Sequence, residues 1–168
     1  MRRIIVALVA MMLSVVGVSA QNYMVVDSEK VFKSLSTYNN ALEQIEQLSA
    51  QYQAKVDAKF QEVERLYNSY MQQRATLSEA TRQQREQQIL QKEQEATEYQ
   101  ESIFGTDGEL MKKRMELIQP IQQRVFSTIE RYASQYGYDL VIDISANPTV
   151  LYYSSKVDYT QQIINALR

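Results

Sequence analysis

Residues 28–136 form one long polar stretch in which apolar side chains recur every three or four positions. In its first half the mean spacing is about 3.5 residues, which is typical of the apolar seam along which one helix packs against another. A helix over residues 28–77 would be about 75 Å long, far longer than a small globular core requires. The sequence therefore predicts a long helical arm. The periodic positions are Val31, Leu35, Tyr38, Leu42, Ile45, Leu48, Tyr52, Val56, Phe60, Val63, Tyr67 and Tyr70.

A turn near residues 76–81 would fold this arm back on itself. Ser78 is placed to cap a new helix whose first turn is acidic. With the turn there, apolar residues meet wherever their numbers sum to about 156, as in the pair Tyr67 and Ile89. Because an antiparallel helix pair requires one constant sum, we expect a helical hairpin. The alternative is one continuous helix in an intermolecular coiled coil.

Three residues that disfavour helices interrupt the returning half of the hairpin. Gly105 and Gly108 would together cost about 2 kcal/mol inside a helix. Pro120 removes one backbone hydrogen bond and should kink its helix. The segment around the glycines is either a loop or a soft, near-helical segment, and the register fits on both sides, at Phe104 and at Met111, which favours near-helical continuity. We expect the two glycines and the proline to act as hinges of the arm.

Three short apolar segments outside the arm indicate β-strands. Residues 22–27 contain four apolar, partly β-branched residues in a row, which is typical of a short buried strand. Residues 138–145 indicate a second strand and residues 150–155 a third, with a turn at residues 146–149 between them.

A short amphipathic helix ends the sequence. Asp158 is placed to cap it, and Gln161 to complete a capping box. Together these elements predict an α+β, mostly helical fold. Residues 21–27 and 137–168 are expected to form a small β-sheet body, which carries the oligomerisation region, and residues 28–136 the antiparallel hairpin arm.

Residues 1–20 have the order of a secretory signal peptide. Arg2 and Arg3 precede an apolar run of about 15 residues, which is shorter than the ~20 that a membrane-spanning helix needs. Small residues end the segment at Ala20, and the absence of a following Cys excludes a lipoprotein anchor. We expect cleavage after Ala20 and export of a mature chain that begins at Gln21. A retained N-terminal anchor is the alternative.

Chemically reactive side chains are scarce, because the sequence contains no Cys and no His. Disulfides and thiol chemistry are therefore excluded, and the commonest general base and metal ligand is missing. Asp139 and Asp143, the only notable carboxylate pair, alternate on an expected strand, where solvated or edge-protecting roles fit better than catalysis. The mature chain would carry 16 basic and 20 acidic residues, a balance that argues against general nucleic-acid binding. We expect no enzyme activity, no cofactor and no metal.

The expected body is too small to bury its own apolar residues. Three strands of about six residues and one short helix leave exposed edges and a poorly covered face. Because each fully buried Val, Leu or Ile contributes about 1.5–3 kcal/mol, we expect several copies to associate through their sheets, and a closed homo-oligomer would remove the edges. The expected oligomer-interface residues are Tyr23, Val25, Val141, Ile142, Ile144, Leu151 and Tyr153.

An opening strand and helix, a proline-containing segment of the arm, a strand pair and a final helix follow one another at characteristic spacings. They span residues 25–32, 104–117 with 119–121, 137–143 with 150–152, and 158–167. In order and spacing these segments resemble the Skp/OmpH family of periplasmic chaperones, and the resemblance covers the whole mature chain. Tyr159 stands where an aliphatic residue is usual in that family.

The resemblance implies a homotrimer with a small β-barrel body and three helical hairpins that enclose a cavity. It implies an ATP-independent holdase of the periplasm, which binds unfolded outer-membrane β-barrel proteins and prevents their aggregation. Members of the family are often strongly basic, whereas this chain is acidic, so contact with a membrane or with lipopolysaccharide is left open. The competing function is a structural or adaptor protein of the cell envelope that docks a partner through its hairpin tip.

Tyrosines and methionines on the arm suit a holdase, because Met repacks readily and Tyr buries its ring while keeping a polar end. Side chains that fit the seam, such as Tyr67, would first of all hold the hairpin together. Tyr70, Met71 and Tyr99 lie off or beyond the seam and are better placed for client contact. The full set of expected client-binding residues is Tyr52, Phe60, Tyr67, Tyr70, Met71, Tyr99 and Ile103.

Overall fold

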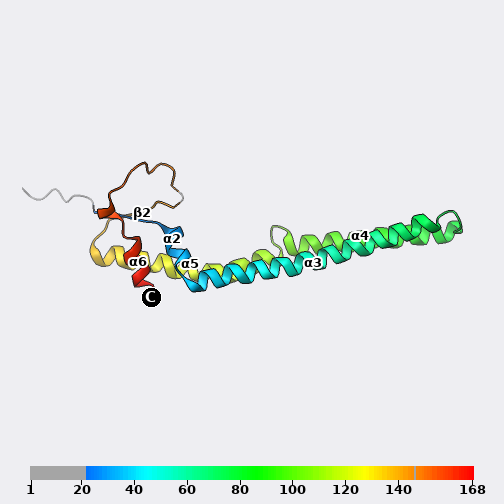
Figure 1. Ribbon diagram of the computed structural model, residues 1–168, viewed down its shortest axis with the longest axis horizontal. Coiled ribbons are helices and arrows are strands. Elements are labelled where there is room, and N and C mark those ends of the chain that lie inside the picture. Colours follow the sequence, from blue (N-terminus) through cyan, green and yellow to red (C-terminus); the bar gives the residue numbers. More distant parts are fainter. Residues whose placement is uncertain (1–21, 146) are drawn as a thin grey trace, which may run out of the picture. The chain divides into compact units, whose positions relative to one another are not determined.

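A computed structural model describes residues 22–145 and 147–168 (Figure 1). The expected signal peptide, residues 1–20, lies outside the described residues. The elements in chain order are β1 (Tyr23–Val26), α2 (Ser28–Lys33), α3 (Ser36–Gln73), α4 (Glu79–Phe104), α5 (Glu109–Tyr136), β2 (Leu140–Asp143), the 3-10 helix η1 (Ser155–Val157) and α6 (Thr160–Ala166). The predicted α+β, mostly helical fold is confirmed.

The chain divides into two compact units. The body unit comprises the described residues up to Ser34 together with those from Val125 onward, and the arm unit comprises residues 35–124. Helix α5 contributes to both units. Among the described residues, no helix combines the length and the apolar character needed to cross a membrane.

Helices α3 and α4 form the antiparallel hairpin of the arm unit and lie side by side (Figure 1). The Tyr70 hydroxyl of α3 donates a hydrogen bond to the Glu86 carboxylate of α4. The Lys59 ammonium of α3 lies 5.0 Å from the centre of the Tyr99 ring of α4. These residue numbers sum to 156 and 158, so the predicted register is confirmed for this helix pair and the continuous helix is wrong.

In the turn between α3 and α4, Ser78 caps the start of α4, as the sequence predicts. The Ser78 hydroxyl accepts a hydrogen bond from the Thr81 N–H at 3.3 Å, which satisfies a donor that the first helical turn would leave unpaired. At the other side, the Thr76 N–H donates to the Gln73 carbonyl oxygen at 2.9 Å. Helix α3 therefore ends before Leu77, the expected end of the outgoing helix.

A break at Ser34 and Leu35 separates α2 from α3, so the expectation of one helix beginning at residue 28 is wrong. Asp27 caps α2 by accepting a hydrogen bond from the Lys30 N–H at 3.0 Å. Leu35 then adopts an extended backbone with φ −91° and ψ 118°, and its side chain is only 9% exposed. The apolar period continues through the break, so periodicity alone does not reveal it.

Residues 105–108 form a loop between α4 and α5, so the near-helical continuity that the register favours is wrong. The loop is tight, since the Gly108 N–H donates to the Gly105 carbonyl oxygen at 2.9 Å. A Cβ on Gly105 would lie 2.5 Å from the Glu101 carbonyl oxygen, and one on Gly108 would lie 2.4 Å from that of Ile103. Glycine is needed at both positions because a side chain would collide with backbone atoms.

Strands β1 and β2 form a two-stranded parallel sheet in the body unit, with Tyr23 opposite Leu140. The other edge of β1 is met by Tyr159, whose N–H donates to the Val25 carbonyl oxygen at 3.0 Å. The last three residues of β1 are at most 1% exposed. β1 is therefore the buried strand predicted for residues 22–27.

Residues 150–155 do not form the third strand that the sequence predicts. Leu151 and Tyr152 are 94% and 86% exposed, and within the part of the chain that the structure describes no strand pairs with this segment. An apolar segment becomes a strand only when it pairs with a sheet edge. In a single chain β1 is flanked on both sides, β2 pairs with β1 alone, and residues 150–155 pair with neither strand.

Helix α5 continues through Pro120 and ends at Tyr136. Gly137 has φ +71°, and the Tyr138 N–H donates to the Ala133 carbonyl oxygen at 2.9 Å. A left-handed glycine with this hydrogen bond is a common helix end, so the predicted stop is confirmed. The hinge role of the proline stays a prediction.

Helix α6 closes the body unit and contacts both α2 and β1. Ile163 of α6, Leu167 directly after it and Val31 of α2 are at most 3% exposed. Burying such side chains contributes roughly 1.5–3 kcal/mol each. This cluster and the buried strand β1 are therefore the core of the body unit.

The start of α6 differs in detail from the prediction. The Asp158 carboxylate accepts a hydrogen bond from the Thr160 N–H at 3.0 Å, but the residue at the N-cap position is Tyr159. The Gln161 amide donates to the Asn165 side chain at 3.0 Å, so it does not complete a capping box. Asp158 thus begins the helix through a local turn one position before the cap.

Candidate functional site

The structure places the expected client-binding residues in three environments. Phe60, Tyr67 and Met71 are 37%, 50% and 47% exposed, Tyr52 and Tyr99 are half-buried, and Tyr70 and Ile103 are both 6% exposed. Because Tyr70 is buried and bonded to Glu86, the expectation that it lies off or beyond the seam is wrong. Contact of any of these residues with a client stays a prediction.

A groove of about 470 Å³ lies between α3 and α4 near their turn, and we call it the tip groove. Tyr67 and Met71 are one helical turn apart and share a face of α3. Leu90 of α4 is 64% exposed and was not among the residues predicted from the sequence. The signal was available, because Ile89 takes the seam position and its neighbour must point elsewhere. The lining residues are Tyr67, Tyr70, Met71, Arg74, Glu86, Ile89, Leu90 and Glu93.

Two methionines of α5 form a second apolar surface in the arm unit. Met111 and Met115 are 43% and 51% exposed and lie one turn apart on the helix. The sequence register assigns Met111 to the seam, but much of its side chain is open to solvent. Met111 also lines a pocket of about 160 Å³, which we call the loop pocket. Its other lining residues are Ile103, Phe104, Gly105, Leu110 and Arg114.

Charged side chains on the arm unit pair along their own helices. The Lys92 ammonium lies 2.8 Å from the Glu95 carboxylate, and Lys113 lies 2.8 Å from Glu116. The hydrogen bond to Glu95 raises the pKa of Lys92 above its ordinary value. Exposed pairs of this kind contribute little to stability. They do neutralise charge locally.

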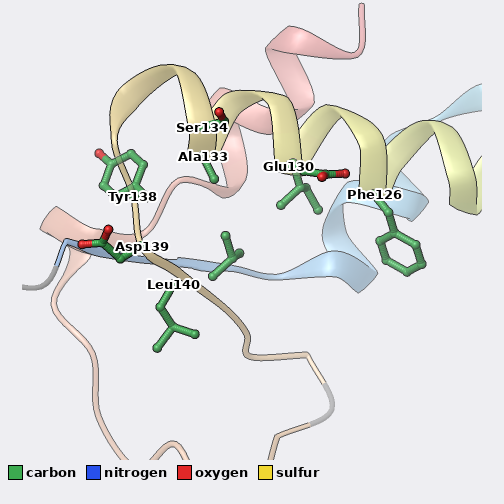
Figure 2. A pocket seen from close by; sticks show the side chains of 9 residues that line it. Phe126, Glu130, Ala133, Ser134, Tyr138, Asp139 and Leu140 are labelled. Carbon is green, nitrogen blue, oxygen red and sulfur yellow. The ribbon is translucent and has the colours of Figure 1, made fainter.

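The body unit has a groove of its own, about 590 Å³ in volume, between α5 and β2 (Figure 2). Phe126 projects from α5 toward this groove and packs edge-on against Phe32, with ring centroids 6.2 Å apart. Phe126 and Leu140 are each 55% exposed. We call this surface, which a single chain leaves open, the body groove. Its lining residues are Phe126, Ile129, Glu130, Ala133, Ser134, Tyr138, Asp139, Leu140 and Val141.

The expected oligomer-interface residues are not all at the surface. Tyr23, Leu151 and Tyr153 are 47%, 94% and 37% exposed, Val141, Ile142 and Ile144 are half-buried, and Val25 is 1% exposed. Val25 lies inside a single body unit because β2 flanks it on one side and Tyr159 on the other. Contact with another copy stays a prediction for the exposed and half-buried residues of this set. Tyr23, Leu151 and Tyr153 expose the most surface for such contact.

Asp139 and Asp143 have separate hydrogen-bonding roles. The Asp139 carboxylate accepts from the Asn22 N–H at 3.2 Å. The Asp143 carboxylate accepts from the Ser28 hydroxyl at 2.5 Å and from the Ser145 N–H at 3.0 Å. Burial raises the pKa of Asp143, but the hydrogen bonds from Ser28 and Ser145 outweigh burial and hold this pKa below its ordinary value of 3.8. The two carboxylates, just before and at the end of β2, thus bind Asn22 and Ser28, which flank β1.

We expect Asp143→Asn to lower the free energy of unfolding of the body unit by about 1 kcal/mol, because a neutral amide accepts weaker hydrogen bonds and solvent screens part of the effect. The folded-state pKa is below the unfolded value, so this stabilisation is present above about pH 4 and is lost as the pH falls through the folded pKa. Hydrogen exchange of the β1 amides, near neutral pH and in acid, measures this stabilisation and its loss at low pH. Asp139→Asn is the matched control, and equal protection in wild type and Asp143→Asn at neutral pH would contradict the prediction.

Four tyrosines gather where α5 ends and α6 begins. The ring centroids of Tyr138 and Tyr159 are 4.9 Å apart, and those of Tyr132 and Tyr136 are 4.5 Å apart. The hydrogen bond with Tyr159 is the largest cause that raises the pKa of Tyr138 from 10.0 to about 12. Tyr159 therefore belongs to an aromatic cluster that joins the two helix ends, a role that an aliphatic side chain at this position would not fill.

Within the described residues, no group of three or more Asp, Glu, His or Cys side chains is arranged to hold a metal ion. Three open surfaces of the described chain are largely apolar: the tip groove and the loop pocket of the arm unit, and the body groove. Such surfaces are suited to binding other polypeptide chains.

Comparison with models of protein families matches residues 22–167 to the family described as outer membrane protein (OmpH-like). Among solved structures, the chain is similar to a Caulobacter crescentus protein described as an OmpH-like outer membrane chaperone, with a TM-score of 0.71 and 11% sequence identity. The match covers 90% of this chain and 86% of that protein. At this identity the likeness concerns the fold. Comparison with curated proteins gives no match.

Proposed function

This chain belongs to the OmpH-like family of outer membrane proteins, and on that premise we propose that it is an ATP-independent holdase of the periplasm. It binds unfolded outer-membrane β-barrel proteins and keeps them from aggregating in transit. The family and the fold support a chaperone role. The observation that carries the finer proposal is the set of exposed apolar side chains on the arm unit, which one chain leaves uncovered: Leu42, Phe60, Tyr67, Met71, Leu90, Met111 and Met115.

A holdase needs several weak contacts rather than one tight pocket. The tip groove and the methionine surface of α5 are separate, and Tyr67 and Leu42 on α3 are about 37 Å apart at the helical rise per residue. A client that touches more than one surface is held by multivalency, while each contact breaks readily. Methionine and tyrosine suit such contacts because they adapt to partners of different shape.

We further propose that copies of the chain associate through their body units, as a trimer if the family resemblance holds. The supporting observations are the open body groove and the exposed Leu151 and Tyr152. A two-stranded sheet is only marginally stable by itself. Residues 150–155 would extend a sheet of a neighbouring copy by strand addition, and the hairpins of the assembly would surround the client.

In this proposal each segment expected from the sequence has one function. Residues 21–27 and 137–168 form the oligomerisation region, and residues 28–136 form the arm that contacts the client. Residues 1–20 direct export and are removed after Ala20. The hairpin arm is proposed to bend at the glycine loop and at Pro120.

Light scattering of a urea-diluted β-barrel protein tests the holdase. We expect the purified protein to suppress client aggregation with no nucleotide present. Replacing Tyr67, Met71 and Leu90 by serine should weaken this suppression several-fold, because it removes the apolar side chains of the tip groove. The matched control replaces exposed polar residues of the same helices, Gln72, Gln84 and Gln88, by serine. No suppression by wild type, or equal losses in both variants, would contradict the proposal.

The tip groove also favours a second candidate function, an adaptor of the cell envelope that docks one partner through its hairpin tip. Tyr67, Met71 and Leu90 lie together close to the turn, as such docking requires. Competition separates the two functions. A holdase bound to one unfolded β-barrel protein is displaced by others that are unrelated in sequence, whereas an adaptor binds a single folded protein and leaves client aggregation unchanged.

A further inference from the structure

The methionines among the described residues fall into two classes. Met24 in β1 is 0% exposed, whereas Met71, Met111 and Met115 of the arm unit are 47%, 43% and 51% exposed. Each exposed methionine belongs to an apolar surface: Met71 to the tip groove, Met111 to the loop pocket, and Met115 to the same face of α5 one turn further. Among the described residues of a sequence without Cys, these thioethers are the sulfur atoms that an oxidant in solution reaches.

We propose that Met71, Met111 and Met115 are oxidation sites through which peroxides weaken the binding surfaces of the arm unit. The thioether sulfur attacks one oxygen atom of hydrogen peroxide, the O–O bond breaks, and a sulfoxide and one water molecule form. The sulfur loses two electrons and the peroxide gains them. The only co-reactant is the peroxide.

The exposure pattern determines where this reaction occurs and what it changes. Susceptibility of methionine follows exposure of the sulfur, so Met24 is protected by the core of the body unit. On the arm unit, a sulfoxide places a polar, chiral group beside Tyr67 and Leu90 in the tip groove. It replaces the adaptable apolar contact of the thioether. Because these side chains face solvent, the helices that carry them keep their fold.

Peptide mapping by mass spectrometry tests the sites themselves. The full chain is treated with hydrogen peroxide, and each methionine-containing peptide is followed over time. Peptides with Met71, Met111 or Met115 should gain one oxygen atom about tenfold faster than the peptide with Met24. Oxidation of Met24 at the same rate as the arm methionines would overturn the proposal. Met1, Met11 and Met12 lie outside the described residues and are followed separately.

The effect on binding rests on the proposed holdase function. Peroxide treatment should lower the apparent affinity for an unfolded β-barrel protein about tenfold, and methionine sulfoxide reductases with dithiothreitol should restore it. The variant with Met71→Leu, Met111→Leu and Met115→Leu keeps side-chain volume and helix propensity. Its apparent affinity for the client is measured before and after peroxide treatment, and the two values should agree.

The outcomes distinguish this proposal from the holdase proposal. If peroxide weakens the leucine variant as much as wild type, or leaves wild type unchanged, oxidation of these methionines does not control binding. If untreated wild type holds no client, the holdase function fails, and peptide mapping still decides on the oxidation sites. Glutamine at the three positions imitates the polar sulfoxide and should weaken client binding without any oxidant.

Discussion

Replacing Leu151 and Tyr153 by glutamate is expected to convert the proposed oligomer into monomers. In a single chain Leu151 is 94% and Tyr153 37% exposed. If residues 150–155 pair as a strand with a neighbouring copy, these two side chains lie on the same face of the sheet. Each buried apolar side chain contributes about 1.5–3 kcal/mol, and a buried charge adds a further penalty. The association constant per interface should therefore fall about a thousandfold or more.

Size-exclusion chromatography with multi-angle light scattering measures the mass of wild type and variant at equal concentration. Circular dichroism verifies that the helices of the arm unit are retained. Tyr152→Glu is the matched control, because residue 152 would lie on the opposite face of the added strand and should weaken association less. Wild type that elutes as a monomer would contradict the oligomer, and an intact oligomer in the double variant would contradict this placement of residues 150–155.

A monomeric variant also separates the contribution of one arm from that of the assembly. Each arm keeps its tip groove, so contact between one hairpin and an apolar client segment persists. What is lost is the simultaneous engagement of several arms, which raises effective affinity by about 10²–10⁴ when the geometry allows it. We therefore expect the monomer to bind short client peptides normally and full-length clients weakly.

The parts of the fold whose stabilising partners are local could be predicted from the sequence. The cap at Ser78 and the end at Gly137 depend on residues within one turn. The α3–α4 register follows from a repeated apolar pattern with one turn, and the bond from Tyr70 to Glu86 confirms it. Each of these features is set by spacing along the chain, and spacing is what a sequence displays directly.

The features that the sequence did not reveal are not marked by its apolar spacing. The break at Leu35 is hidden because the apolar period runs through it. The glycine loop depends on how closely the backbone at residues 101–103 approaches the glycines. Residues 150–155 stay unpaired although β2 pairs on one side only, so their own apolar pattern does not decide whether they form a strand.

The candidate site divides in the same way. Tyr67 and Met71 could be predicted because they belong to the uninterrupted helix α3. Met111 and Met115 could not, because their exposure depends on how α5 resumes after the loop.

Gly105→Ala combined with Gly108→Ala is expected to destabilise the arm unit by about 2–5 kcal/mol. Each new Cβ would lie within 2.5 Å of a backbone carbonyl oxygen, so the backbone at Glu101 and Ile103 would have to move. Overpacking of this kind typically costs 1–3 kcal/mol per site. If the segment were helical, the same substitutions would stabilise it by about 2 kcal/mol, because alanine has the highest helix propensity. The sign of the effect therefore decides between loop and helix.

Thermal unfolding with hydrogen exchange of residues 101–110 measures this effect, and Thr106→Ala in the same loop is the control, with an expected change within about 0.5 kcal/mol.

The result also bears on the proposed hinge. The loop interrupts the returning side of the hairpin, whereas α3 is one uninterrupted helix over Ser36–Gln73. Bending of the arm at this loop therefore deforms only α3, because the returning side is already interrupted there. A double variant that is more stable than wild type and captures a narrower range of client sizes would mean that the segment can become helical. A less stable variant with faster exchange confined to the loop would mean that the glycines maintain a preformed bend.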